Sequence, residues 1–195
     1  MIGVVDTGGA NLTSLFAAFE RLGARAEMVD SAAGLARSSR VVLPGVGAAG
    51  EAMRRLQRAG LANLIAGLRV PVLGICLGMQ LLFEQSAEDD SHGLSVLPGR
   101  VDALVARGPV TVPHMGWSRL KRRRASPLMK GIDTSEYFYF VHSFVAEDSD
   151  LTVASVTHGR SFSAVVQRDN FFGTQFHPER SGRAGSRLLE NFLAI

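Results

Sequence analysis

The fold of this 195-residue chain is decided by the stretch Val70-Pro71-Val72-Leu73-Gly74-Ile75-Cys76-Leu77-Gly78-Met79-Gln80-Leu81-Leu82-Phe83. Its first half, after the proline, is a short run of β-branched and aliphatic residues, which is typical of a buried strand. Its second half is an apolar run at helical spacing, which predicts a helix that begins after Cys76 and extends to Phe83. The only cysteine of the chain is therefore expected at a turn from strand to helix.

Cys76 stands where the nucleophile of a strand–turn–helix elbow would stand, with cysteine in place of serine. Gly74 and Gly78 lie two residues to either side, where a sharp turn crowds Cβ atoms and glycine has none. The N-terminus of the following helix would favour the thiolate form of the sulfur. Most lone cysteines are small buried apolar side chains, but the glycines and the strand-to-helix context favour a nucleophile here.

A thiolate nucleophile needs a base, and the base needs a group that orients it. Among the five histidines, His177 follows the apolar run 171–176 and is followed two residues later by Glu179. This carboxylate can bond one imidazole nitrogen and leave the other nitrogen for the sulfur. His92 and His158 stand in polar contexts and are expected to be surface or satisfied core residues.

Length and composition predict a globular protein with one sizeable core. Hydrophobic residues make up 46% of the chain and charged residues 20%, and one cysteine cannot form an internal disulfide. No apolar run reaches the ~18 residues of a membrane span, and no secretory pattern opens the sequence. We therefore expect one domain over residues 1–195, located in the cytoplasm, with no membrane partner.

The charge pattern gives little support to a nucleic-acid partner. The formal net charge is only +3, and the one basic cluster, 119–124, has no interleaved aromatic residues. A solvated loop is favoured for this cluster over a patch that binds phosphate or a protein partner. The glycine-rich segment 7–11 lacks the spacing of the common nucleotide-binding motifs, so a nucleotide site is not supported.

The first half of the chain alternates short strands and helices, which is typical of a parallel sheet with helices on both faces. From Leu94 onward, short strand patterns predict an antiparallel or mixed extension of the same sheet, and 86–93 is expected to be a mobile surface loop. Asn11 is a candidate cap of the first helix. The expected strands are 2–5, 24–29, 40–43, 72–75, 101–106, 110–112, 137–141, 151–156 and 162–166, and the expected later helices are 31–37, 51–68 and 182–193.

The segment Pro44-Gly45-Val46-Gly47 follows the third expected strand. It can be an ordinary turn, but two glycines also let backbone N–H groups approach a substrate closely. Ligands of parallel sheets bind at the carboxyl ends of the strands, so this loop and Cys76 are expected at the same edge.

The elbow motif from Gly74 to Gln80, together with Phe-His-Pro-Glu at 176–179, resembles the class I glutamine amidotransferases. That resemblance implies an α/β fold of the same type: a flavodoxin-like three-layer sandwich with a mixed, mostly parallel central sheet and helices on both faces. It implies a catalytic triad of Cys76, His177 and Glu179, and an oxyanion hole made by the backbone of Val46 and Leu77. It implies no metal and no cofactor. The implied glutamine-binding residues are Gly47, Gln80, His142, Ser143 and Phe144.

The stretches Pro-His-Met-Gly-Trp at 113–117 and Tyr-Phe-Val-His-Ser-Phe at 139–144, with Met79, resemble a narrower family almost end to end. This is the family of glutaminase subunits of imidazole glycerol phosphate synthase. The resemblance implies hydrolysis of glutamine to glutamate and ammonia, which passes to a cyclase subunit with a (β/α)₈ barrel. The implied complex is a heterodimer of histidine biosynthesis. The candidate interface residues are Asn11, Met115, Trp117 and Arg180.

The chain departs from that family at Thr7, Ala10, Ser118 and Phe144, where Tyr, Gly, Asn and Tyr are usual. The departures concern partner contacts and the glutamine pocket and leave the triad intact. Two alternatives stay open. One is the glutaminase of a different synthase or a related Cys-His peptidase or hydrolase, and the other is a non-catalytic regulatory binding module on the same fold.

Overall fold

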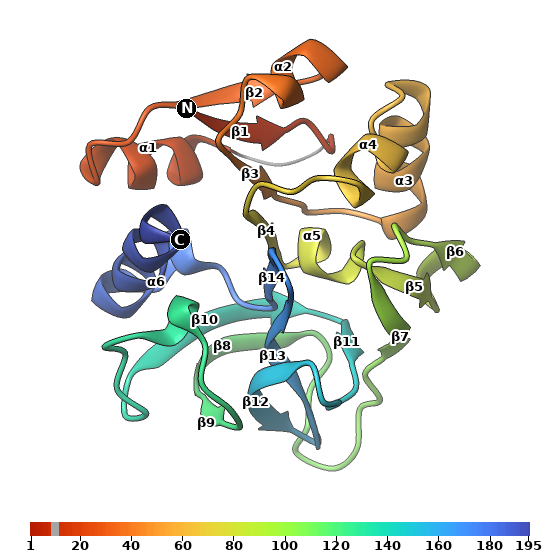
Figure 1. Ribbon diagram of the computed structural model, residues 1–195. Helices are drawn as coiled ribbons and strands as arrows, with labels where there is room; N and C mark the ends of the chain where they lie inside the picture. Colours follow the sequence, from red (N-terminus) through yellow and green to blue (C-terminus); the bar gives the residue numbers. More distant parts are fainter. Residues whose placement is uncertain (9–11) are drawn as a thin grey trace.

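The computed structural model describes residues 1–8 and 12–195. Ala10 and Asn11, with their expected roles, lie outside the described residues. An eight-stranded sheet runs through the centre of the molecule (Figure 1). The strand order is β2 (Ala26–Val29), β1 (Ile2–Val5), β3 (Arg40–Leu43), β4 (Val72–Ile75), β14 (Phe171–Thr174), β13 (Arg160–Arg168), β12 (Thr152–His158) and β9 (Lys121–Arg122). The strands from β2 to β14 in this order are parallel, and the strands beyond β14 are antiparallel.

Helices cover both faces of the central strands. Helices α1 (Thr13–Arg21) and α6 (Gly182–Ala194) lie on one side, and α3 (Ala49–Arg58), α4 (Ala62–Ala66) and α5 (Leu77–Gln80) lie on the other (Figure 1). The short helix α2 (Ala32–Ala36) follows β2, with Ser31 accepting a hydrogen bond from Gly34 N–H at its start. The expected α/β architecture with helices on both faces is confirmed.

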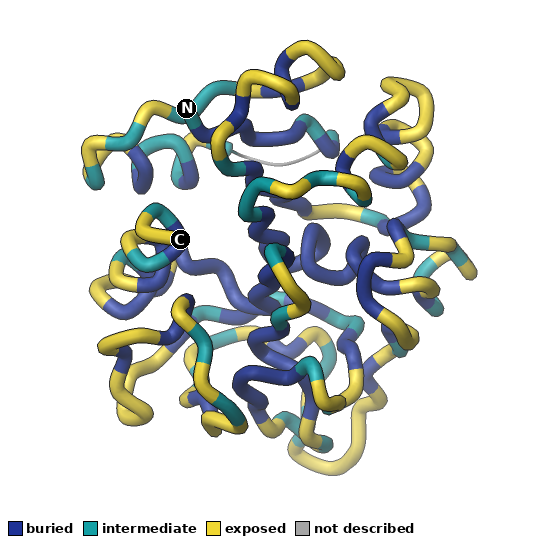
Figure 2. The backbone as a smooth tube through the Cα atoms, in the orientation of Figure 1, coloured by how far each residue is buried: buried dark blue, intermediate teal, exposed yellow. Residues whose placement is uncertain are grey.

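The hydrophobic core is divided by the sheet into two clusters, because successive strand residues point to opposite faces. Leu73 packs with the cluster of α1 and α6, whereas its neighbour Val72 packs with the cluster of α3, α4 and α5. Figure 2 shows the central strands buried along their length. The ends of β4 and β14, where the expected nucleophile and base stand, are therefore held by packing on both sides.

Two smaller sheets stand apart from the central one, so the expectation that the second half of the chain extends a single sheet is wrong in part. Strands β8 (His114–Arg119) and β10 (Tyr137–His142) form an antiparallel pair. Strands β11 (Phe144–Ala146), β7 (Leu97–Ala103), β5 (Phe83–Ser86) and β6 (Ser91–His92) form the other sheet. The expected strand 110–112 makes only an isolated bridge between Arg107 and Val110. Strand patterns predict extended backbone but do not specify the pairing partner.

Two expected helices are shorter than the apolar patterns predicted. The segment 51–68 is divided into α3 and α4 at Gly60, whose φ of +68° ends the first helix. A single helix over 51–68 would turn Leu64 inward with the other apolar residues, but Leu64 is 45% exposed. The helix after Cys76 ends after one turn, at Gln80, and β5 begins at Phe83. A short apolar run fits a buried strand as well as a buried helix, which explains the second error.

The polar segment 86–93 was expected to be a mobile surface loop, but it contains regular structure. It contains a 3₁₀ turn, Glu88–Asp90, and the short strand β6, which pairs with β5. The Glu88 carboxylate accepts a hydrogen bond of 2.8 Å from Ala49 N–H, at the start of α3. This acidic side chain caps a helix N-terminus and ties the segment to α3.

The basic cluster 119–124 is also not a solvated loop, because it contains the end of β8 and all of β9. The Arg122 guanidinium donates to the carbonyl oxygens of Met129 (3.1 Å) and Ile132 (2.7 Å). The Arg124 guanidinium donates to those of Leu151 (3.2 Å) and Gln167 (2.6 Å). These arginines hold neighbouring segments together.

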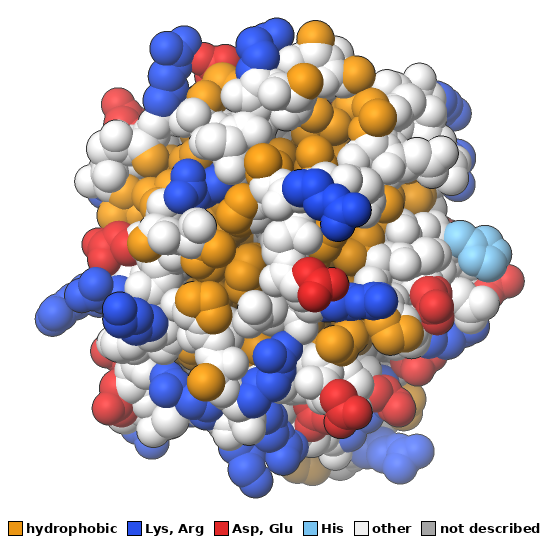
Figure 3. Space-filling model, in the orientation of Figure 1, with side chains coloured by type: hydrophobic (Ala, Val, Ile, Leu, Met, Phe, Trp, Pro, Cys, Tyr) orange, Lys and Arg blue, Asp and Glu red, His pale blue; other side chains and the backbone are white. Residues whose placement is uncertain are grey.

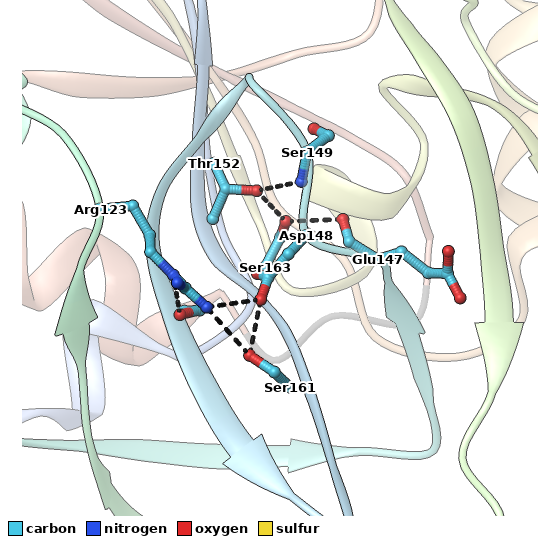
Figure 4. A network of polar contacts seen from close by, with 8 residues as sticks. Arg123, Glu147, Asp148, Ser149, Thr152, Ser161 and Ser163 are labelled. Carbon is cyan, nitrogen blue, oxygen red and sulfur yellow. Dashed lines mark hydrogen bonds and ion pairs between the residues drawn. The ribbon is translucent and has the colours of Figure 1, made fainter.

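Arg123 belongs to a polar network that joins β9 to the β12–β13 hairpin (Figure 4). Its guanidinium contacts Asp148 at 3.1 Å, and the same carboxylate accepts a hydrogen bond of 2.6 Å from the Ser161 hydroxyl. Ser163 donates to the Glu147 carbonyl at 2.9 Å, so the Thr152 hydroxyl, 2.7 Å away, donates to Ser163. The network makes the cluster part of the scaffold.

The surface view in Figure 3 shows a central band of hydrophobic side chains on one face, with basic and acidic side chains interspersed around it. Across residues 1–8 and 12–195, none of the helices has the length and hydropathy that a membrane crossing requires.

Candidate active site

The turn after β4 holds Cys76 in a strained backbone conformation, with φ +53° and ψ −111°. A Cβ on Gly74 would lie 2.6 Å from the Gly78 carbonyl oxygen, and a Cβ on Gly78 would lie 1.7 Å from the Leu43 carbonyl oxygen. Only glycine fits these positions, as the sequence predicted. The elbow is thereby pressed against the end of β3.

His177 reaches the same edge of the sheet because β14 is the parallel neighbour of β4, with Thr174 paired with Ile75. Cys76 N–H donates to the Thr174 carbonyl at 2.7 Å, which fixes the two strand ends together. Pro178 then begins a 3₁₀ turn, Pro178–Arg180, that turns the chain back. His177 Nδ1 lies 2.9 Å from Glu179 Oε1, and both side chains are almost fully buried.

The charge of His177 is set by these two neighbours. Burial alone would lower the pKa of His177, but the interactions with Cys76 and Glu179 outweigh it and raise the pKa to about 10. The imidazole therefore carries a proton on each nitrogen at neutral pH. Within the described residues, Nε2 is buried without a hydrogen bond of good geometry, and the Cys76 sulfur is close enough to raise the pKa of the ring.

The loop at Pro44 to Gly47 lies directly against the elbow, because a Cβ on Gly45 would stand 2.8 Å from Leu77 Cβ. Leu77 opens α5, and the first N–H groups of a helix have no acceptor within it. Gly47 has φ +98°, and Val46 is 42% exposed. The two backbone segments expected to form the oxyanion hole are thus neighbours at the sulfur.

Thr7, one of the departures from the family pattern, has a structural contact at this loop: its buried hydroxyl donates a hydrogen bond of 2.9 Å to the Pro44 carbonyl. The segment that follows β1 therefore holds the first residue of the loop. Such a contact restricts the start of the loop, whereas a Cβ added at Gly47 would have no atom within 4 Å.

A cavity of about 210 Å³ opens between this loop, α1 and the His177–Glu179 pair. It gathers the expected residues Val46, His177, Glu179 and Arg180 around one space. Its lining residues are Leu12, Leu15, Pro44, Gly45, Val46, Ile75, Val141, His177, Glu179 and Arg180.

On the other side of the sulfur stands Gln80, which is buried. Its Nε2 donates to the Phe144 carbonyl at 3.0 Å and to Gln175 Oε1 at 3.1 Å. Gln175 Nε2 in turn lies 3.7 Å from Cys76 Sγ. Gln175 was missed by the sequence reasoning, although a glutamine directly after the apolar residues of β14 is the signal that could have found it.

His142 stands near the site but differs from what was expected of it. Its Nδ1 bonds the Phe144 carbonyl at 3.0 Å, and its Nε2 lies 3.1 Å from His114 Nδ1. The imidazole is therefore saturated by the chain, and a contact with glutamine through a free ring nitrogen is not available. Burial and the neighbouring His114 lower the pKa of His142 to about 3, so the ring is neutral.

The expected interface residues Met115 and Trp117 are 63% and 55% exposed and share one face of β8. Tyr139 stands opposite Trp117 on β10, with their rings edge to face at 5.7 Å between centroids. Arg180 lies at the cavity, and Asn11 is outside the described residues. No group of three or more His, Cys, Asp or Glu side chains within the described ranges is arranged to hold a metal ion.

Comparison with known proteins agrees with this geometry. The family model "Glutamine amidotransferase class-I" matches residues 3–195. The subunit HisH of imidazole glycerol phosphate synthase from Xylella fastidiosa is 49% identical over 194 residues, covering 100% of this chain and 97% of the relative. That from Xanthomonas euvesicatoria is 50% identical with the same coverage. The chain belongs to the HisH family of class I glutamine amidotransferases.

This membership confirms two predictions from the sequence: the chain is a glutamine amidotransferase, and it is a member of the glutaminase-subunit family of imidazole glycerol phosphate synthase, an enzyme of histidine biosynthesis. The membership speaks against both alternatives, a different hydrolase and a non-catalytic module.

Solved structures of low sequence identity share the fold. A crystal structure of a glutamine amidotransferase superposes with a TM-score of 0.77 at 19% identity, covering 99% of this chain and 97% of the other. The PurLQS structure from Thermotoga maritima superposes with a TM-score of 0.74 at 20% identity and the same coverage. These likenesses confirm the predicted fold class.

Proposed function

We propose that this HisH-family chain hydrolyses glutamine through Cys76, His177 and Glu179 and delivers the ammonia to a (β/α)₈-barrel cyclase subunit in a cytoplasmic heterodimer. The observation that carries the proposal is the convergence of three independent segments at one sheet edge. These are the strained elbow at Cys76, the His177–Glu179 pair 2.9 Å apart, and the loop at Val46. Residues 1–195 act in this proposal as one amidotransferase domain.

In the first half-reaction, the Cys76 sulfur attacks the side-chain carbonyl carbon of glutamine. The backbone N–H groups of Val46 and Leu77 bind the oxygen as it becomes negative, and removal of one such donor typically costs ~10²–10³ in rate. His177 gives its Nε2 proton to the departing nitrogen, and ammonia leaves. A glutamyl thioester remains on Cys76.

In the second half-reaction, the now neutral His177 takes a proton from water, and the hydroxide attacks the thioester carbonyl. The thioester bond breaks, glutamate leaves and the sulfur returns as thiolate beside the protonated imidazole. Glu179 keeps its hydrogen bond to Nδ1 throughout and thereby favours the charged ring.

Glutamine is held beside Gln80 and the segment 143–144. Both amide hydrogens of Gln80 are donated to the protein, so its Oε1 is left to accept from the substrate ammonium group. The backbone at Gly47, Ser143 and Phe144 completes the pocket in this proposal. His142 contributes through the Phe144 carbonyl that it bonds, not through a free ring nitrogen.

The exposed face of β8 and β10 supports a docking site for the cyclase. Tyr137 and Tyr139 stand opposite Arg119 and Trp117, and Val141 on the same face lines the cavity at His177. An aromatic surface that continues into a reaction cavity suits a partner that receives the product directly. A seal over this cavity would keep ammonia from being protonated in bulk water.

The proposal is tested by purifying the chain with the cyclase subunit of its host. Glutamate release is measured for the chain alone, with the cyclase, and with the cyclase and its ligand. We expect the rate to rise at each step, and no glutamate release in any of the three would contradict the proposal. Trp117→Ala should weaken the complex by about 2 kcal/mol or more, whereas Val105→Ala, at another exposed apolar position, should not.

A further inference from the structure

A chain of polar contacts runs from β8 to the nucleophile, and the mechanism above assigns no part to three of its members, Ser118, His114 and Gln175. It begins at Ser118 on β8, next to Trp117, whose Oγ lies 3.0 Å from His114 Nε2. It continues through His142 to the Phe144 carbonyl, with contacts of 3.1 and 3.0 Å. From there Gln80 and Gln175 lead to the Cys76 sulfur through contacts of 3.0, 3.1 and 3.7 Å.

The Phe144 carbonyl fixes the direction of every hydrogen bond in this chain, because a carbonyl oxygen can only accept. On one side, His142 must carry its proton on Nδ1, so its Nε2 accepts from His114 Nδ1–H. His114 Nε2 then accepts the hydroxyl hydrogen of Ser118. Both rings are neutral, since burial lowers the pKa of His114 to about 4 and that of His142 to about 3.

On the other side, the same carbonyl orients two amide groups. Gln80 Nε2 donates to it and, with its second hydrogen, to Gln175 Oε1. The Oε1 of Gln175 is thereby committed as an acceptor, so its Nε2 faces the sulfur as a donor. Gln175 is fully buried, and its amide has little freedom to turn over.

We propose that Gln175 is a further catalytic residue, which donates a hydrogen bond to the Cys76 sulfur, and that His114 and His142 position its amide through the Phe144 carbonyl and Gln80. A buried N–H that points at sulfur stabilises the thiolate, before attack and again when the thioester breaks. A reversed amide would instead turn a carbonyl oxygen toward the thiolate. The inference rests on the proposed function only in taking Cys76 as the nucleophile.

Cys76 is the only cysteine in the chain, so alkylation by iodoacetamide reports this thiolate alone. The midpoint pH of alkylation is measured for the full chain and for Gln175→Met, which keeps the length of the side chain and removes the donor. We expect the midpoint to rise by about one pH unit, the size expected for one hydrogen bond to a charged group. His177, Glu179 and His142, the titratable groups around the sulfur, remain in the variant.

Gln167→Met is the matched control, because it makes the same chemical change on β13, where the Gln167 side-chain oxygen is buried without a hydrogen bond among the described residues. Its alkylation midpoint should stay at the wild-type value. If Gln175→Met does not fold, Gln175→Glu keeps the shape and places an anion at the sulfur, which should raise the midpoint further. A midpoint unchanged from wild type in a folded Gln175 variant overturns the proposal, whether or not the chain hydrolyses glutamine.

The positioning role of the imidazoles has a separate test at His114. In His114→Phe the ring stacking on Phe140 is kept and the donor to His142 is lost, whereas in His114→Asn the amide nitrogen can stand in for Nδ1. We expect His114→Phe to shift the alkylation midpoint to higher pH and to raise the KM for glutamine several-fold. In His114→Asn both quantities should return toward their wild-type values. If the two variants shift both quantities equally, the imidazoles do not act through a hydrogen bond and the positioning part is wrong.

Discussion

The groups that contact the Cys76 sulfur come from different strand ends. The Val141 carbonyl lies 3.9 Å from Sγ and belongs to β10, whereas Gln175 and His177 follow β14. In the proposed mechanism each residue has a distinct part: His177 exchanges protons and Gln175 donates a hydrogen bond, while Val141 lines the cavity. Single substitutions should therefore separate their effects.

Cys76→Ser should abolish glutamine hydrolysis while the fold remains. The two side chains are similar in size, but a neutral hydroxyl is a far weaker nucleophile than a thiolate. In a complex with the cyclase, cyclisation supplied with ammonium salt should persist, which serves as the control for folding and docking. Full glutaminase activity in this variant would remove Cys76 from the mechanism.

His177→Asn should be more damaging than Glu179→Gln. In the proposed mechanism His177 moves a proton in both half-reactions, whereas Glu179 orients the ring and stabilises its charge through the 2.9 Å contact. We expect a loss of several orders of magnitude in kcat for the first variant and a smaller loss for the second. Glutamate release under saturating glutamine measures both, and wild-type rates in either variant would contradict the triad.

At the scale of single elements, the elbow depends on close backbone approach. The position of Gly78 against the Leu43 carbonyl joins α5 to the end of β3, and Gly45 joins the loop to the same turn. Two glycine substitutions distinguish positions that need space from positions that need an unusual backbone angle.

Gly78→Ala should destabilise the protein by about 3 kcal/mol or prevent folding, because its Cβ would lie 1.7 Å from a backbone oxygen that cannot move away. Gly67→Ala is the control, since a Cβ there would be 3.5 Å from its nearest neighbour, which is ordinary contact. Thermal unfolding of both variants measures the difference. Similar melting temperatures would mean that the elbow can relax.

Gly47→Ala should change the basal and the partner-stimulated glutaminase rates by different factors. No atom lies within 4 Å of the added Cβ, so its effect comes from the backbone, where φ +98° is unfavourable for alanine. If docking of the cyclase turns this peptide toward the oxyanion position, alanine will disfavour only one of the two loop states. The ratio of stimulated to basal rate is the measurement, and an unchanged ratio would contradict a loop that changes state.

For the whole molecule, three buried histidines predict how stability depends on pH. The pKa values of His114 and His142 are lowered by burial to about 4 and about 3, so the unfolded chain gains protons first as pH falls below ~6.5, and stability decreases. The pKa of His177 is raised to about 10, so its contribution is complete below ~6.5 and is lost as pH rises through 10. We expect maximum stability near neutral pH.

Urea unfolding between pH 5 and pH 10 measures this dependence. Each histidine contributes a slope of at most about 1.4 kcal/mol per pH unit. His114→Phe should flatten the acid side of the curve of unfolding free energy against pH, because it removes a titrating group. Glu179→Gln should flatten the alkaline side, because it removes the carboxylate that helps to raise the pKa of His177. A curve of unchanged shape in both variants would contradict the assigned protonation states.

The local features of the site were predictable because they depend on neighbours in the sequence. The glycines at the elbow, the order His-Pro-Glu at 177–179 and the alternation of strands and helices all follow from backbone sterics and side-chain periodicity. The same kind of signal was available but missed at Gly60, which divides one expected helix into two. The family resemblance added the roles of these residues.

Only the tertiary structure decided which strands of the second half pair and which distant polar groups meet. Gln80 and Gln175 are 95 residues apart, and His114 and His142 are 28 residues apart, yet each pair is in hydrogen-bond contact. Periodicity determines which face of a strand is buried but not its partner or register. The sequence by itself therefore determined the fold class and predicted the nucleophile and the base. The polar chain behind the sulfur came from packing, because burial requires each polar group to find whatever partner the fold places beside it.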